Sequence, residues 1–177
     1  RLNNGEVPSL RGAIAEVLGL DYASLARERG TPVQREELPA ILASVGTEGT
    51  LRSAGDVIER IDALARRFIE GLAAHGFSPT AIGEAVSALG EEPGKVPLVL
   101  EYICRRLYPA LSRTTEEIDA LLRGFDGRFI PPGPAGAPTR GMAGVLPTGR
   151  NFYSMDPRSI PSETAWQVGR ELAESLL

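Results

Sequence analysis

TLRSAGDVIERIDALARRFIEGLAAHG, residues 50–76, is the longest amphipathic pattern in this sequence of 177 residues. Apolar side chains return every three or four positions, which places them on one side of an α-helix, while arginine and acidic residues fill the other side. Gly76 is a helix-ending residue. The stretch therefore predicts a long helix with one broad buried face. Its apolar positions are Leu51, Ala54, Val57, Ile58, Ile61, Leu64, Ala65, Phe68, Ile69 and Leu72.

Shorter amphipathic patterns flank this helix, and most of them end at a glycine. None of them shows the strict alternation that is typical of a half-buried β-strand. We therefore predict a mainly α fold, a multi-helix domain followed by an irregular loop segment and a terminal helix. The shorter helices are expected over residues 8–18, 21–29, 35–45, 78–89, 96–111 and 114–123, with the terminal one starting at residue 162.

Residues 127–161 differ from the rest of the chain in composition. These 35 residues hold 7 of the 14 prolines and 6 of the 20 glycines, so neither a helix nor a central strand is expected. Such a segment is either a linker or a functional loop, and its aromatic and aliphatic residues favour an ordered loop. We expect a helical domain over 1–126, a Pro/Gly-rich signature loop over 127–161 and the start of a terminal helix over 162–177.

Composition and charge exclude several classes of function. No apolar run is long enough to span a membrane, and the single cysteine, Cys104, fits a reducing cytosol, so we expect a cytoplasmic protein. The loop segment carries a net charge of +3 and the whole chain −4, which leaves −7 on the rest. An acidic body with a modestly basic loop is a poor partner for nucleic acid but suits a small carboxylated or phosphorylated ligand. The chain begins at Arg1, and we expect a piece of a longer protein.

Motifs for catalysis and metal binding are weak. The run GVLPTGRN, residues 144–151, has the glycine spacing of a phosphate-binding P-loop, but Arg150 and Asn151 stand where that motif needs lysine and a hydroxyl residue. His75 is the only histidine, so we expect it to serve as a helix-end residue rather than a metal ligand. Cys104 is interpreted as a small buried hydrophobe. Adjacent acidic pairs such as Glu116 and Glu117 are expected to be solvated helix starts.

A family resemblance adds to this interpretation. The run DGRFIPPGPAGAPTRGMAGVLPTGRNFYSMDPRSIP, residues 126–161, together with ETAW at 163–166, resembles a signature of the CobN and magnesium chelatase H subunit family. The pieces VPSLR at 7–11 and GLDYASL at 19–25 are similar to the same region, so the likeness covers essentially the whole chain. GAPTRG and GRNFYSMDP resemble the cobalt form more closely than the magnesium form.

The resemblance implies a part of the large, tetrapyrrole-binding subunit of an ATP-dependent cobaltochelatase, which inserts cobalt into hydrogenobyrinic acid a,c-diamide during cobalamin biosynthesis. An AAA+ ATPase subunit and a subunit with an integrin-type metal domain are the implied partners. Cobalt is the substrate metal, and ATP with magnesium acts at the level of the complex, so this piece is expected to bind neither and to be inactive alone. The alternatives are the same region of a magnesium chelatase or a purely structural module.

The resemblance also implies where substrate binds. The family's His- and Glu-rich metal-handling motif has no counterpart here, so no catalytic or metal residue is carried over. The substrate-binding residues implied by the signature have polar groups or turn geometry suited to a carboxylated macrocycle, although they could equally tie the loop to a surface. These residues are Thr148, Gly149, Arg150, Asn151, Asp156 and Arg158.

Overall fold

The computed structural model describes residues 7–34, 38–45, 51–134, 136, 138, 143–150 and 163–175. The described elements are helical, which confirms the predicted mainly α fold; β structure among the described residues is limited to isolated bridge residues, such as the pair Pro32 and Ser53. The chain divides into two compact units, Arg1–Ser112 and Arg113–Leu177. Helix α8 thus groups with the loop that follows it rather than with the preceding body; the domain bounds expected from the sequence remain a prediction.

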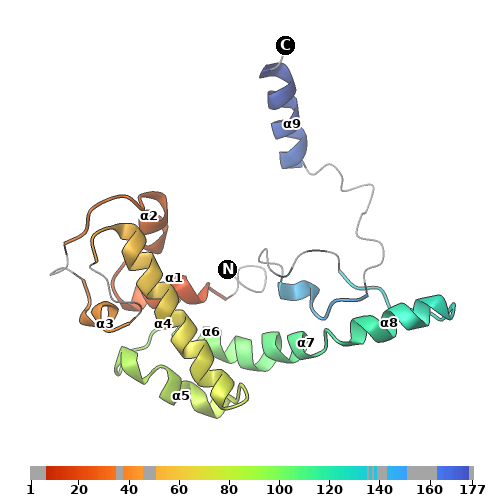
Figure 1. Cartoon of the computed structure of the whole chain (residues 1–177), viewed down its shortest axis with the longest axis horizontal. Helices are drawn as coiled ribbons and strands as arrows, with labels where there is room; N and C mark the ends of the chain where they lie inside the picture. Colours follow the sequence, from red (N-terminus) through yellow and green to blue (C-terminus); the bar gives the residue numbers. More distant parts are fainter. Residues whose placement is uncertain are drawn as a thin grey trace. The chain divides into compact units, whose positions relative to one another are not determined.

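The first unit is organised around the helix predicted from residues 50–76. This helix, α4, runs over Ala54–Ala74 and packs against α1 (Leu10–Val17), α2 (Tyr22–Arg27) and α3 (Ala40–Ala43) (Figure 1). Further along the chain come the 3₁₀ turns Pro79–Ala81 and Ser87–Leu89, with α5 (Ile82–Ala85) between them, and then α6 (Val96–Tyr102). Helix α6 continues through a π-helical stretch, Ile103–Leu107, into α7 (Tyr108–Ser112).

Two of the expected helices differ from the structure. The pattern over residues 78–89 forms two 3₁₀ turns and one α-helical turn instead of one helix, with Gly90 ending them at a φ of 81°. Within the pattern over 35–45, α3 covers only Ala40–Ala43, while residues 35–37 lie outside the described part. Short segments follow tertiary contacts more than their own periodicity, because a single turn of helix is marginal in isolation.

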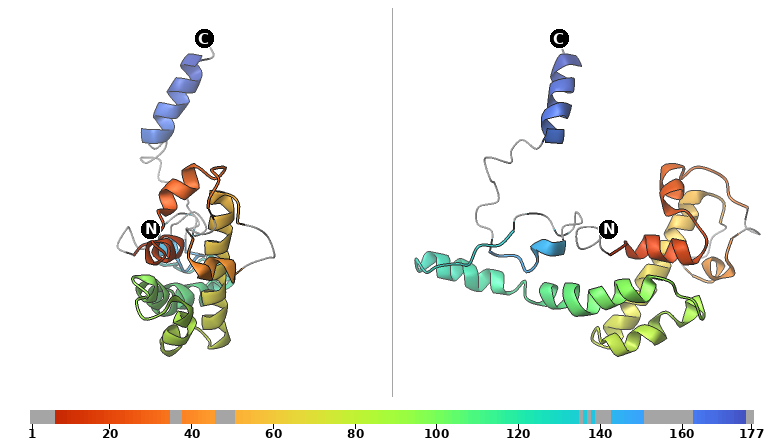
Figure 2. Two further views of the ribbon diagram at one scale, coloured as in Figure 1. Left: turned by 90° about the vertical axis from the view of Figure 1, so that its left-hand side faces the viewer. Right: turned by 180° about the vertical axis from the view of Figure 1, so that it is seen from behind.

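The core of the first unit lies under the apolar face of α4. Val57, Ile61, Leu64, Phe68 and Leu72 are completely buried there, together with residues of α1, α3 and α6. No charged or polar residue in the described part of the chain is buried. Figure 2 shows α1 in red beside α6 in green, two helices that also contact each other. Burial of apolar area is therefore the main force that holds this unit together.

A capping box determines where α4 begins. The Ser53 hydroxyl accepts a hydrogen bond from the Asp56 amide at 3.3 Å, and the Asp56 carboxylate accepts from the amides of Ser53 at 2.9 Å and Arg52 at 2.8 Å. The Arg52 amide, followed by the Ser53 amide, lowers the pKa of the Asp56 carboxyl below its ordinary value. The box satisfies helix-end donors that otherwise have no partner.

The lowered pKa of Asp56 predicts an acid-sensitive helix start. Because the carboxyl binds a proton more readily in the unfolded chain, its contribution is complete above the unfolded pKa and is lost as the pH falls through the lower, folded pKa. We expect unfolding midpoints of the Asp56→Asn variant to be lower than wild type at pH 7, to begin to approach wild type as the pH falls below about 4, and to meet it only below the folded pKa of Asp56. Glu59→Gln, an exposed change on the same helix, is the control; a gap between Asp56→Asn and wild type that persists in acid would contradict the assignment.

The second unit contains α8 (Glu116–Phe125), a 3₁₀ turn at Ala143–Val145 and α9 (Glu163–Ser175). Helix α9 confirms the predicted terminal helix, and α8 corresponds to the pattern expected from residue 114. Val145 and Pro147 are buried, so the loop segment that carries the family signature is packed over 143–150. No helix of the described residues is long and apolar enough to cross a membrane.

Candidate anion-binding site

One face of α8 carries mostly polar side chains, which we call the polar row. Glu116, Asp119, Ala120 and Arg123 follow the i, i+3, i+4, i+7 spacing that places side chains in one row along a helix. Acidic residues in the first turn and Arg123 in the last turn also suit the helix dipole. The row faces a cavity, which it lines, so the polar side of α8 is turned toward the loop segment of its own unit.

Gly149 brings the loop backbone into contact with α8. Its φ of 84° lies in the left-handed region, which residues with a side chain rarely adopt. A Cβ added at this position would lie 2.6 Å from Cγ and 2.7 Å from Cβ of Glu117, and it would also overlap the Glu117 Cα. Glycine is therefore required both by the turn and by the close approach, and the two neighbouring residues, Thr148 and Arg150, are held against the helix.

A cavity of about 400 Å³ lies between α8 and the loop. Helix α8 supplies the polar row, Arg113 lies three residues before the helix begins, and the loop supplies Thr148 and Arg150. Every lining residue belongs to the second unit. The cavity thus combines three guanidinium groups with two carboxylates and one hydroxyl. Its lining residues are Arg113, Glu116, Asp119, Ala120, Arg123, Ile130, Pro131, Thr148 and Arg150.

One carboxylate of the cavity already forms an ion pair with an arginine. Arg113 donates from Nε to Glu116 Oε1 at 2.7 Å and from Nη2 to Oε2 at 3.0 Å, which is the two-pronged geometry of a strong pair. These hydrogen bonds lower the pKa of Glu116, and the positive charge of Arg150 lowers it further. In return, Glu116 raises the pKa of Arg113. Glu116 is therefore ionised, and both of its carboxylate oxygens accept hydrogen bonds from Arg113.

Arg150 is the unsatisfied donor of the site. Its Nε atom is buried and, within the described structure, has no hydrogen-bond partner. Leaving a buried donor of a charged group unpaired costs free energy, which an acceptor placed in the cavity would recover. The Thr148 hydroxyl and Arg123 line the same space. A carboxylate or phosphate oxygen is the type of ligand atom that this arrangement accepts best.

The six predicted substrate-binding residues divide into three groups. Thr148 and Arg150 line the cavity, whereas Gly149 contacts Glu117 and shapes the loop. Asn151, Asp156 and Arg158 lie outside the described residues.

The residues that α8 and its start contribute to the cavity were not predicted as site residues. The helical spacing of the polar row is a signal that could have identified them. It was not used, because acidic residues at the start of a helix are usually solvated. The missed residues are Arg113, Glu116, Asp119 and Arg123.

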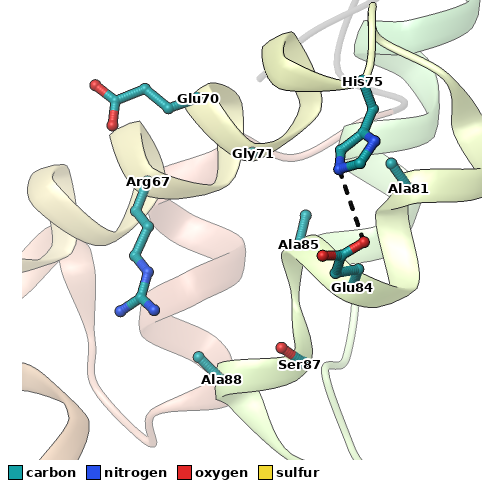
Figure 3. A pocket seen from close by; sticks show the side chains of 9 residues that line it. All are labelled: Arg67, Glu70, Gly71, His75, Ala81, Glu84, Ala85, Ser87 and Ala88. Atoms are coloured by element: carbon teal, nitrogen blue, oxygen red, sulfur yellow. Dashed lines mark ion pairs between the residues drawn. The ribbon is translucent and has the colours of Figure 1, made fainter.

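A second cavity, of about 330 Å³, lies in the first unit between α4 and α5 (Figure 3). His75 and Glu84 face each other across one end, with 3.7 Å between His75 Nε2 and Glu84 Oε2, and Arg67 stands at the other end. His75 is the C-cap of α4, as its helix-end prediction requires. The described residues contain no group of three or more metal-ligating side chains. None of the described residues that line this cavity has a buried side-chain nitrogen or oxygen without a hydrogen-bond partner, in contrast to Arg150 in the cavity beside α8.

Cys104 is buried in the π-helical stretch, in agreement with its interpretation as a small hydrophobe. Burial raises the pKa of its thiol, and the nearby Arg105 offsets this only in part. A thiol held in its neutral form is a poor nucleophile.

Comparison with known proteins decides the family. The family model described as CobN/Magnesium Chelatase matches residues 1–177. The chain belongs to the CobN/magnesium chelatase family. It is 41% identical over 174 residues, 98% of its length, to the aerobic cobaltochelatase subunit CobN of Pseudomonas aeruginosa. It is also 41% identical over 140 residues, 78% of its length, to the aerobic cobaltochelatase subunit CobN of a Sinorhizobium species.

The magnesium branch of the CobN/magnesium chelatase family matches less of the chain. The magnesium-chelatase H subunit of Chlorobaculum parvum is 34% identical over 115 residues, or 63% of the chain. In each case the match covers a small part of the relative: 13% and 10% of the two CobN proteins and 9% of the magnesium-chelatase protein. No solved structure matches the chain.

Proposed function

We propose that this chain is part of the large subunit of a cobaltochelatase and that the cavity beside α8 binds a carboxylate of the tetrapyrrole. The observation that carries the proposal is the buried, unpaired Nε of Arg150 in a cavity that the family signature lines. Membership of a family of tetrapyrrole chelatase subunits supports a ligand of this chemistry. Peripheral carboxylates make such a macrocycle an anion, which arginine binds in a directed way.

The choice of cobalt rests on relative similarity. The two CobN proteins match at 41% identity, whereas the magnesium-chelatase protein of Chlorobaculum parvum matches at 34% over a shorter stretch. In the proposed reaction, cobalt is the substrate metal, and it enters hydrogenobyrinic acid a,c-diamide in a step driven by ATP with magnesium. An AAA+ ATPase subunit and a subunit with an integrin-type metal domain complete the complex. The residues of the cavity bind and orient the macrocycle in this scheme, and the metal is handled outside this chain.

A structural role is the second candidate, and a specific observation favours it. Gly149, a member of the signature, packs against Glu117 and has no polar side chain to offer a ligand. Part of the signature therefore serves to hold the loop on α8. In a purely structural module, Arg150 would also belong to that packing and would never touch substrate.

Replacing Arg150 with alanine in the full-length subunit separates the two candidates. We expect the dissociation constant for the corrin precursor to rise by about 10- to 100-fold, since a charge-assisted hydrogen bond contributes roughly 1.5–3 kcal/mol. The melting temperature should stay close to the wild-type value, because Nε has no hydrogen bond to lose and Glu116 keeps its ion pair with Arg113 when the more distant charge of Arg150 is removed. Binding is measured by fluorescence or absorbance titration, and stability by calorimetry.

Arg105→Ala is the matched control, because Arg105 is an exposed arginine that pairs with Glu101 in the first unit. It should change neither quantity. Unchanged affinity together with a lower melting temperature in Arg150→Ala would reject substrate binding in favour of the structural role. Titrating the same proteins in parallel with protoporphyrin and with the corrin precursor distinguishes a magnesium from a cobalt enzyme.

A further inference from the structure

Helix α8 is oriented in an unusual way for an amphipathic helix. Its polar row lines the cavity of its own unit, while the apolar residues on the opposite side face solvent. Ile118, Leu121, Leu122 and Phe125 follow the helical i, i+3, i+4, i+7 spacing, so they form one continuous stripe. Their exposed fractions are 66%, 44%, 55% and 80%. We name these four residues the α8 stripe.

The α8 stripe requires a partner. Single exposed apolar residues are common on protein surfaces, but a contiguous row of four large ones marks an interaction surface. The usual reason for an amphipathic pattern is burial of the apolar side, and here the chain uses the polar side for its internal contact instead. A surface other than the loop that contacts the polar row must therefore cover the α8 stripe.

Helix α9 has a matching bare surface. Trp166, Val168 and Leu172 are exposed at 62%, 49% and 60%. At 100° per residue, Val168 and Leu172 lie about 40° apart on the helix, and Trp166 lies about 120° beyond Leu172 at the other edge of the same side. The small residues Gly169 and Ala173 fall between Leu172 and Trp166. In the described part of the second unit, the exposed large hydrophobic residues are those of α8 and α9, together with Phe129.

We propose that α9 packs its apolar side on the α8 stripe. The chain from Arg150 to Glu163 advances 13 residues, which can span up to roughly 43 Å. Helix α8 is only about 15 Å long, so α9 can reach any part of the stripe. Because both helices belong to one polypeptide, α9 is present at an effective concentration in the millimolar range, which no separate partner matches at ordinary concentrations.

The charges of the two helices predict how this docking responds to salt. Helix α8 carries Glu116, Glu117 and Asp119 against Arg123, a net −2, and α9 also carries a net −2, from Glu163, Glu171 and Glu174 against Arg170. Like charges weaken the association and salt screens them, whereas apolar burial does not weaken with salt. The docking therefore strengthens as sodium chloride is added. It does not depend on which ligand the cavity binds.

Trp166 is the only tryptophan of the chain, so its fluorescence reports the docking directly. In the 177-residue chain at low concentration, we expect a blue-shifted emission and protection from acrylamide quenching, both increasing with salt. In the double variant Ile118→Asn and Leu122→Asn, the emission should shift to the red and the protection should be lost. Both replaced side chains are more than half exposed in α8 itself, so circular dichroism should show unchanged helix content.

Leu98→Asn is the matched control, since Leu98 is a leucine with 51% exposure in the first unit. It should leave the tryptophan signal unchanged. The proposal is overturned if Trp166 is fully accessible in the monomeric wild-type chain. It is also overturned if protection appears only when light scattering shows a dimer, which would make a second copy the occupant. Loss of protection in Leu98→Asn but not in the α8 double variant would equally overturn it, by placing α9 on the first unit.

Discussion

Gly149→Ala is expected to detach the signature loop from α8. Two costs add at this position: the left-handed backbone, with its φ of 84°, and the overlap of the new methyl group with Glu117. The backbone cost alone is about 1–2 kcal/mol, and the overlap involves the Glu117 Cα, which cannot move without shifting the helix. Because the loop cannot keep both its turn and its contact, the whole segment should leave the helix rather than adjust locally.

The consequence of this change extends to the candidate site. Thr148 and Arg150 flank Gly149, so they lose their places in the cavity when the loop leaves α8. We expect faster hydrogen exchange and faster proteolysis at residues 143–150, with the melting of the first unit unchanged. In the full-length subunit, affinity for the tetrapyrrole should fall at least as far as in Arg150→Ala.

Two other glycines provide matched controls for Gly149→Ala. Gly127 has a φ of 68°, and a Cβ added there would have no neighbour within 4 Å, so Gly127→Ala measures backbone strain alone. Gly144 has neither a positive φ nor a close neighbour, and Gly144→Ala should be silent. If hydrogen exchange and proteolysis at residues 143–150 were as slow in Gly149→Ala as in Gly144→Ala, the close approach to Glu117 would not be a real constraint.

Phe68→Ala is expected to produce the largest loss of stability in the first unit. Phe68 is completely buried in the middle of α4, among the side chains that form the core. Replacing a buried phenylalanine by alanine typically costs about 3–5 kcal/mol, from lost burial plus the cavity left behind. Since a domain of this size is stable by only about 5–15 kcal/mol, the variant should lie close to unfolding at physiological temperature.

Denaturant unfolding followed by circular dichroism measures this loss. Phe129→Ala removes the same atoms from a side chain that is 78% exposed, so its midpoint should remain near that of wild type. Equal midpoints for the two variants would show that α4 does not organise the core. The comparison isolates burial, because the two substitutions are chemically identical.

Prediction from the sequence succeeded where long patterns exist. The stripe over residues 50–76 predicted α4 because ten apolar positions agree on one face, and the buried residues of the helix are nearly all on that face. Residues 78–89 carry too few periodic positions to specify a helix, and contacts with α4 and α6 decide their turns instead. In the loop, Thr148 and Arg150 were predicted through the family signature, since no physical pattern marks an irregular segment.

The sequence alone determined the helical class of the fold, the core face of α4 and the family, because these depend on periodicity and on signature residues that can be read in one dimension. Only the tertiary structure decided that α8 turns its polar row inward, that Gly149 meets Glu117, and that Arg150 keeps an unpaired buried donor. An amphipathic pattern states that a helix has two faces. The face of α8 that packs against the rest of its unit depends on where the loop segment 143–150 can lie. The position of that loop depends on contacts between residues distant in sequence, such as Gly149 and Glu117.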